Sequence, residues 1–516
     1  MYVRKLACIL ILCTSVASLT TPAFGQLVDQ ALAPNYINEG IHKSLTEQIG
    51  AGRGDVLTLD SSLFIINRDP FRAIRRGRQL FQRKFTVSQG RGPGLGDGAG
   101  DLDENNAIGA GLADSCAACH GRPRGAAGSG GDVATRPDSR DAPHLFGLGL
   151  KEMLADEITA DLRAIQAQAI AEAQASGGAV TKPLSSKAIL YGAITADPDG
   201  AVDTSEVEGV DADLRVRPFA RQGETLSIRE FVVAALNKEM GLQAEDPDLT
   251  AACAGETVTT PSGMVLDGST DIIEAPPTGA TQIPVSLVDF FEFYLLNYFK
   301  PATYEQTSQT AQGVAIFKQI GCTTCHIQNL QIDRDRRVAD VETVYDPIKG
   351  ILNGLFATAT TSHVAVNDGT PYPPLKQPAL KPFLVENIFT DFKRHDLGPN
   401  FYERNYDGTV QQLFLTTPLW GVGSTAPYGH DGRSINLTEV ILRHGGEAQE
   451  ARDRFAGLPV DQRRDVLDFL NSLVLFPPDD TASNLNPGDP QAPYFPQNGH
   501  GAISLGKLFN DPSDPE

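Results

Sequence analysis

Cys116-Ala-Ala-Cys-His120 and Cys322-Thr-Thr-Cys-His326 are two copies of one short motif in a chain of 516 residues. In each copy the two cysteines and the histidine lie on one side of a helical turn. Two such thiols can bond to the two vinyl groups of a haem, while the imidazole binds its iron. A zinc or redox Cys-x-x-Cys site is the alternative for this spacing. Because both copies carry the histidine, we expect two covalently attached haem c groups, held by Cys116, Cys119 and His120 and by Cys322, Cys325 and His326.

The first 25 residues have the pattern of an export signal. Arg4 and Lys5 form a short basic segment, residues 6–16 are apolar, and Ala23-Phe24-Gly25 offers small residues at a cleavage site. We therefore expect residues 1–25 to be removed and the mature protein to be periplasmic or secreted. No later apolar stretch approaches the ~20 residues of a membrane helix, so no membrane span is expected.

Composition narrows the choice of partners. The formal net charge is -21 and the sequence pI is about 4.8, which argues against nucleic acid and anionic membranes. Such a surface fits a soluble exported protein or one that docks with a basic redox partner. Outside the signal and the two motifs, Cys253 is the remaining cysteine, so no disulfide framework is expected, and we expect this thiol to be buried.

A repeat appears around the two motifs. Gly77-Arg-Gln-Leu-Phe81 precedes the first and Gly313-Val-Ala-Ile-Phe317 precedes the second, each in an apolar pattern of helical period. Helical patterns over 285–300 and 460–476 close the two units. We expect a mainly α protein of two cytochrome c-like domains with long loops. The predicted segments are a signal peptide (1–25), an N-terminal extension (26–70), domains over 71–300 and 301–478, and an irregular tail (479–516).

The sixth ligand of each iron separates an electron carrier from an enzyme. A second strong ligand gives a haem that passes electrons, whereas an open position lets peroxide or oxygen bind. The remaining mature histidines and methionines are the candidates, and the residues alone do not choose among them: His42, His144, His363, His395, His430, His444, His500, Met153, Met240 and Met264.

Several longer stretches resemble the di-haem oxidoreductase family, which is itself similar to bacterial di-haem cytochrome c peroxidases and the methylamine dehydrogenase maturation enzyme. The resemblance covers most of residues 71–476 and is most specific near the C-terminus. The stretches are Phe85-Thr-Val-Ser-Gln-Gly-Arg-Gly-Pro93, Ala142-Pro-His-Leu-Phe-Gly-Leu-Gly149, His395-Asp-Leu-Gly-Pro399, Thr417-Pro-Leu-Trp-Gly-Val-Gly423, Pro427-Tyr-Gly-His-Asp-Gly-Arg433 and Ile441-Leu-Arg-His-Gly-Gly-Glu-Ala448.

This resemblance implies roles for two further residues. The peroxidases place a methionine ligand of the C-terminal haem about 14 residues after the His-Asp-Gly turn, and here His444 occupies that place. The resemblance therefore implies a bis-His haem on His326 and His444, of lower potential than a His/Met haem. The peroxidases also carry a distal Glu in a Glu-Met-Gly context, about 20 residues after an aromatic residue between the haems. Glu239 and Phe219 match these places, although Phe219 replaces a tryptophan.

Fainter matches imply a calcium ion and leave some roles open. Asp141, Thr416 and Pro418 stand where the family binds calcium between its domains, and a carboxylate with carbonyl oxygens suits that cation. A capping role is the alternative for Asp141. His144 is either a haem-site residue or structural, and Arg433 pairs either with a haem propionate or with a neighbouring carboxylate. Trp420 is expected to pack against the C-terminal haem.

The resemblance favours a peroxidase-type oxidoreductase that takes electrons from a small redox protein or cytochrome and passes them to hydrogen peroxide or another small oxidant. Glu239 would then be the catalytic acid–base group at the open N-terminal haem. A purely electron-transferring cytochrome is one alternative, and a haem-dependent oxygenase or protein-modifying enzyme is another. The fold alone does not separate these three functions.

Overall fold

The computed structural model describes residues 44–85, 115–121, 142–276, 283–297, 302–303, 307–341, 359–404 and 408–474. The predicted signal peptide and C-terminal tail lie outside these residues. Among the described residues, 40% are helical and 17% lie in strands. The expectation of a mainly α protein is therefore wrong, because the long segments between the predicted helices form many short strands.

Helices carry many of the buried hydrophobic side chains among the described residues. They are α1 (Leu45–Ile49), α2 (Ser62–Arg68), α3 (Pro70–Gln82), α5 (Cys116–His120), α6 (Leu148–Ser176), α7 (Ile228–Lys238), α8 (Pro247–Cys253), α9 (Val285–Leu296), α10 (Ser308–Gln319), α12 (Leu437–Arg443), α13 (Gln449–Ala456) and α14 (Val460–Asn471). Short 3₁₀ turns lie at η3 (Cys322–Thr324), η4 (Val422–Ser424) and η5 (Gly446–Ala448).

The strands form small antiparallel sheets. The largest described sheet joins β1 (Val180–Ser186), β2 (Ile189–Ala196) and β3 (Val202–Asp203). The others are two-stranded pairs: β4 (Thr257–Thr259) with β5 (Val265–Asp267), β6 (Ala302–Thr303) with β17 (Leu473–Val474), β7 (Leu330–Ile332) with β12 (Phe383–Val385), β8 (Ala339–Val341) with β9 (Ala359–Thr361), β10 (His363–Val366) with β11 (Leu375–Pro378), β13 (Arg394–Asp396) with β16 (Leu413–Leu415), and β14 (Glu403–Arg404) with β15 (Val410–Gln411).

The sequence repeat has a counterpart in the packing of two helix pairs. In the first pair, α3 packs on α9 and Gly77 faces Phe290 and Tyr294. In the second, α10 packs on α14, and Gly313 faces Asp465 and Phe469. Each glycine lets the two helix backbones approach closely, because a side chain there would collide with the partner helix. The helices expected around both motifs are thus present.

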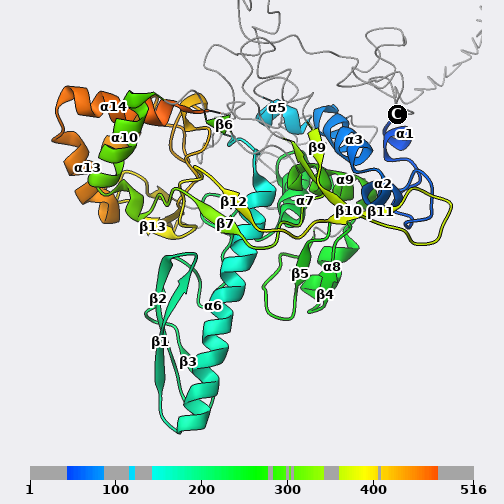
Figure 1. Cartoon of the computed structure of the whole chain (residues 1–516), viewed down its shortest axis with the longest axis horizontal. Coiled ribbons are helices and arrows are strands. Elements are labelled where there is room, and N and C mark those ends of the chain that lie inside the picture. Colours follow the sequence, from blue (N-terminus) through cyan, green and yellow to red (C-terminus); the bar gives the residue numbers. More distant parts are fainter. Residues whose placement is uncertain are drawn as a thin grey trace, which may run out of the picture.

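An arm built from α6 and the β1–β2–β3 sheet extends from the body (Figure 1). The β1–β2 turn places Lys187 and Ala188 at φ values of 49° and 63°, a conformation that usually takes Asn-Gly. The Lys187 ammonium holds this turn by donating to Glu157 at 2.7 Å and to the Gln331 carbonyl at 2.6 Å. Since Lys-Ala carries no turn signal, the sequence did not reveal this hairpin.

Buried side chains form two hydrophobic clusters. The first surrounds α9, whose residues are buried on nearly every side, and the second joins α10 to α14. The segment 385–392 contributes side chains to both clusters, since Ile388 lies in the first cluster and Phe389 in the second. The predicted domain boundary near residue 300 stays a prediction. Cys253, expected to be buried, is exposed at the end of α8.

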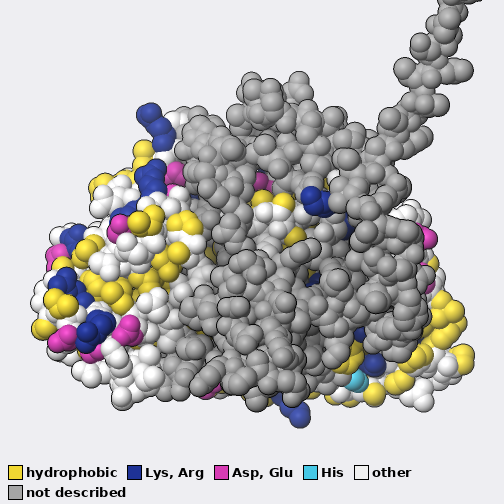
Figure 2. All heavy atoms as spheres, turned by 90° about the horizontal axis from the view of Figure 1, so that it is seen from above, with side chains coloured by type: hydrophobic (Ala, Val, Ile, Leu, Met, Phe, Trp, Pro, Cys, Tyr) yellow, Lys and Arg dark blue, Asp and Glu magenta, His cyan; other side chains and the backbone are white. Residues whose placement is uncertain are grey.

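Within the described residues, no helix combines the length and apolar character needed to cross a membrane. Seen from above, hydrophobic side chains gather over the end of the molecule that carries α10, α13 and α14, among charged side chains of both signs (Figure 2).

Candidate functional site

The first motif forms the single turn of α5. Ser115 caps this turn by accepting a hydrogen bond from the Ala118 N–H at 3.1 Å, which brings Cys116, Cys119 and His120 onto one short helix. The His120 Nδ1 lies 2.7 Å from the Pro143 carbonyl oxygen. With Nδ1–H donating there, the lone pair lies on Nε2, the arrangement common to metal-ligating histidines.

The second motif repeats this arrangement on a tighter turn. Gly321 adopts a φ of 96° and directs the chain into η3, so that Cys322, Cys325 and His326 follow at once. The His326 Nδ1 lies 3.0 Å from the Phe389 carbonyl oxygen, and burial lowers the pKa of His326. Both motif histidines therefore have a fixed tautomer with Nε2 as the ligand atom. These residues fit two haem c groups.

His444 lies at the end of α12, close enough to His326 to interact with it electrostatically. Its Nδ1 donates to the Val440 carbonyl oxygen at 2.6 Å, so its lone pair is also on Nε2. Burial lowers the pKa of His444 to about 4, and the nearby His326 and Arg443 add to this effect. A neutral, oriented imidazole next to His326 is suited to be the sixth ligand there, and this role stays a prediction.

His395 has a different environment. Its Nε2 lies 2.8 Å from Asp391 and its Nδ1 2.6 Å from Glu447, so both ring nitrogens bond to carboxylates. Burial opposes protonation, but the Asp391 carboxylate and the free Cys325 sulfur together outweigh burial and raise the pKa of His395 to about 11. Such an imidazolium has no lone pair for iron.

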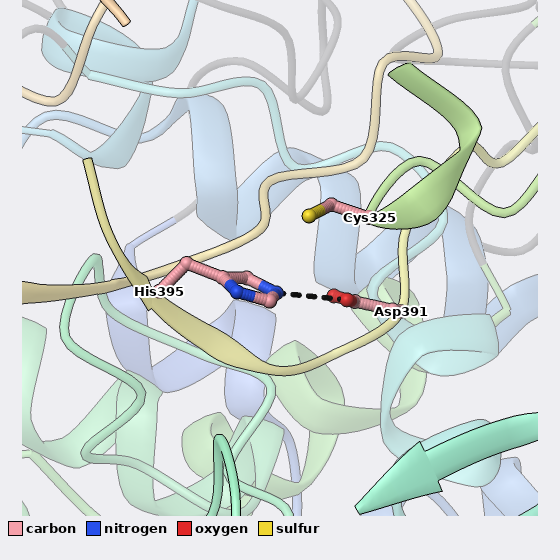
Figure 3. Close-up of side chains that lie close together, drawn as sticks. All are labelled: Cys325, Asp391 and His395. Carbon is pink, nitrogen blue, oxygen red and sulfur yellow. Dashed lines mark hydrogen bonds and ion pairs between the residues drawn. The ribbon is translucent and has the colours of Figure 1, made fainter. Parts of the chain in front are cut away.

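Figure 3 shows His395 beside Asp391 and the Cys325 sulfur, whose ligand atoms lie within 4.8 Å of one another. This group resembles a cation site only while Cys325 is a free thiol. A thioether to haem, which the motif predicts for this sulfur, would make it a poor ligand, and we assign no metal ion to this cluster.

His430 is held by aromatic packing. Its ring stacks on Phe414 with centroids 4.2 Å apart and an interplanar angle of 13°, and its Nε2 lies 3.5 Å from Glu403. The neighbouring Arg433 is largely exposed and pairs with Asp431 at 3.3 Å. This is the pairing with a neighbouring carboxylate that the sequence offered as one of two roles for Arg433.

His144 connects the surroundings of His120 to the C-terminal half of the chain. Its Nδ1 accepts from the Phe146 N–H at 3.2 Å, and its Nε2 lies 3.2 Å from the Trp420 carbonyl oxygen. Burial, with smaller contributions from the nearby Lys151 and His120, lowers the pKa of His144 to about 3. Both nitrogens are engaged, so His144 has a structural position beside His120.

Trp420 packs into the first hydrophobic cluster, although it belongs to a C-terminal motif. Its ring lies against Gly147, where a Cβ atom would come within 2.8 Å of the indole. The sequence predicted packing on the C-terminal haem, whereas the structure places this ring at the start of α6, near the loop that accepts the His120 hydrogen bond.

Glu239 occupies the C-cap of α7 and is partly buried, while Met240 beside it and Phe219 belong to the first hydrophobic cluster. The Gly- and Asp-rich segment between α3 and α5 lies outside the described residues. The distal role of Glu239 over the haem on His120 therefore stays a prediction.

The calcium site is described only in part. The Thr416 carbonyl oxygen accepts a hydrogen bond from the Thr390 hydroxyl at 2.6 Å, which leaves one lone pair for a cation. Pro418 is buried two residues later, and Asp141 lies outside the described residues. Calcium binding stays a prediction.

One comparison with known proteins bears on this site. Residues 357–473 match the family model described as "Di-haem oxidoreductase, putative peroxidase". This range contains His395, His430 and His444 but neither Cys-x-x-Cys-His motif. The resemblance predicted from the sequence is confirmed for this range. No curated protein matches the chain significantly.

Proposed function

We propose that this chain is an exported di-haem c-type oxidoreductase of the peroxidase kind. Electrons enter at the His326 site, and hydrogen peroxide or another small oxidant is reduced at the His120 site. The observation that carries the proposal is the shared geometry of the two motif histidines, each with Nδ1 on a main-chain carbonyl. Bound haem would supply the redox-active iron at each site.

An asymmetry between the two sites supports different roles. His326 has His444 close by, neutral and with its lone pair on Nε2. The histidine near His120 is His144, and both of its ring nitrogens already bond to the protein. A haem iron with two strong protein ligands transfers electrons, whereas a haem iron without a second protein ligand can bind an oxidant.

Glu239 is the residue that we assign to proton movement at the His120 site. Cleavage of an O–O bond requires a proton taken from one oxygen and delivered to the other. A carboxylate held near the oxidant can do both, and such groups contribute ~10²- to 10⁴-fold to a rate.

The donor of electrons is proposed to be a small redox protein or cytochrome. The net charge of -21 favours a partner with a basic docking face. Calcium at Thr416, Pro418 and Asp141 belongs to the same proposal and would support the structure between the haems.

The deciding experiment combines an EPR spectrum of the oxidised protein with stopped-flow reaction of the reduced protein with peroxide. We expect one high-spin and one low-spin haem and rapid peroxide reduction. Glu239→Gln should slow the reaction while leaving the spectra unchanged, and Glu245→Gln, at an exposed position nearby, should react like the wild type.

The other outcomes separate the alternatives. Equal rates in the wild type and Glu239→Gln would remove Glu239 from the mechanism. Two low-spin haems and no reaction would favour a purely electron-transferring cytochrome. A high-spin haem that ignores peroxide would favour an oxygenase.

A further inference from the structure

Lys151, in the first turn of α6, is a partly buried cation with an unusual environment. Its ammonium lies 5.3 Å from the centroid of the Phe219 ring. Among the described residues, no carboxylate forms an ion pair with it, and the adjacent Glu152 instead accepts from the Ile228 N–H at 2.7 Å. Burial lowers the pKa of Lys151 to about 8, with no carboxylate to offset that effect.

Several other buried cations among the described residues are paired with carboxylates. Arg229 is fully buried and bonds to Asp246, Asp289 and Glu292. Lys187 forms an ion pair with Glu157, and the buried Arg68 forms one with Asp368. A buried charge without a partner costs several kcal/mol, which is why such charges are paired in native proteins. Lys151 therefore has no anionic partner among the described residues, and a bound group that carries a carboxylate could supply one.

The location of Lys151 points to that partner. Lys151 lies in the first turn of α6, seven residues after His144, and Gly147 at the start of that helix lies against the Trp420 ring. Lys151 and His120 are both close enough to His144 to lower its pKa. His144 follows Pro143, whose carbonyl accepts the His120 hydrogen bond. The ammonium thus lies beside the N-terminal haem site, on the side where the Trp420 segment meets it.

We propose that Lys151 binds a propionate of the haem attached at Cys116 and Cys119. The carboxylate supplies the negative charge that the ammonium lacks, and Phe219 covers the pair from solvent. Lys151 is then a positioning residue that fixes the orientation of this haem and favours its reduced state through its positive charge. The inference rests on the proposed function only in requiring that haem be attached there.

Redox titration of the purified holoprotein, followed by visible spectroscopy, tests this assignment. Lys151→Met should lower the midpoint potential of the N-terminal haem and leave that of the C-terminal haem unchanged. Lys151→Arg should restore most of the difference, because it keeps the charge. Lys238→Met is the matched control, since Lys238 is exposed and pairs with Glu274 at 3.2 Å, and it should shift neither potential.

Two results would overturn the inference: unchanged potentials in Lys151→Met, or a shift confined to the C-terminal haem. The C-terminal haem is identified as the one whose spectrum changes when His444 is replaced. Intact mass of the wild type reports the haem count separately, so a wild type without the N-terminal haem would count against the proposed function and not against the role of Lys151. If Lys151→Met does not fold, Lys151→Gln provides the same comparison.

Discussion

At the scale of single residues, His444 and His395 show how surroundings decide the chemistry of an imidazole. Both lie near the second motif, yet the pKa is lowered to about 4 for His444 and raised to about 11 for His395. The first is buried with a carbonyl partner, and the second lies between two carboxylates. His444 is a neutral imidazole and His395 is an imidazolium at neutral pH, so His444 is the better candidate for an iron ligand.

Replacing His444 tests this distinction. His444→Ala should convert one low-spin haem to high spin, because the iron loses its sixth ligand. His444→Met should keep the low-spin state and raise the potential of that haem, because a thioether favours reduced iron. EPR and redox titration give the two results. An unchanged low-spin spectrum in the alanine variant would mean that another residue, such as His430, is the ligand.

A buried charge cluster makes stability depend on pH. Arg229 bonds to Asp246, Asp289 and Glu292 at 2.9–3.0 Å, in a cluster with more carboxylates than cations. Burial raises the pKa of Glu292 to about 7, against the attraction of Arg229. Because the folded pKa exceeds the unfolded value of 4.5, the associated stability is present at low pH and is lost as pH rises towards 7.

Glu292→Gln should therefore remove part of the pH dependence. At pH 5 the variant and the wild type should have similar free energies of unfolding. At pH 8 the variant should be more stable, by up to ~3 kcal/mol, since it has no carboxylate to ionise. Guanidinium titrations at both pH values measure this, with Glu274→Gln on the surface as the control. A variant that is less stable at pH 8 would show that the ion pair with Arg229 outweighs the burial of charge.

At the scale of secondary-structure elements, two glycines set the distance between paired helices. A Cβ at Gly313 would lie 2.0 Å from the Asp465 carbonyl oxygen, and one at Gly77 would lie 2.5 Å from the Phe290 carbonyl oxygen. Both contacts are with backbone atoms, which cannot move away by a rotamer change as a flexible side chain can. The first helix of each unit can therefore pack closely on its closing helix because the glycine has no side chain at the point of contact.

Gly77→Ala and Gly313→Ala should each lower the free energy of unfolding by ~1–3 kcal/mol, despite the better helix propensity of alanine. Chemical denaturation followed by circular dichroism measures the change. Gly178→Ala is the control, because a Cβ there would meet nothing within 4 Å. Wild-type stability in both helix variants would mean that the helices separate at little cost.

The sequence predicted these helices well and the strands poorly. Apolar residues at helical spacing identify α3, α10 and α14, and a longer apolar run identifies α9, which is buried on nearly every side. The arm was missed because its hairpin turns through Lys187-Ala188 and depends on contacts with Glu157 and Gln331, far along the chain.

The candidate site was also predictable only where its residues lie close together in the sequence. The Cys-x-x-Cys-His motifs are local, and the sequence alone identifies them. The contacts of His120 with Pro143, of His326 with Phe389, of His144 with Trp420 and of Lys151 with Phe219 form only after distant segments have packed together.

At the scale of the whole molecule, both haems should be covalent. Acid–acetone extraction should leave all haem on the polypeptide, because thioether bonds survive conditions that release haem held by its iron alone. Intact mass should show two haem groups on the wild type and one on either Cys116→Ala/Cys119→Ala or Cys322→Ala/Cys325→Ala. Freely extracted haem would contradict the reading of both motifs.

The two histidine–carbonyl contacts also imply an order of events during folding. The acceptor for His120 lies 23 residues further along the chain, and the acceptor for His326 lies 63 residues further. Closing the longer loop costs ~1 kcal/mol more chain entropy, since this cost grows as (3/2)RT ln n. The N-terminal part is also synthesised first. The N-terminal site should therefore become ordered before the C-terminal one, so a chain arrested during folding would expose its second haem.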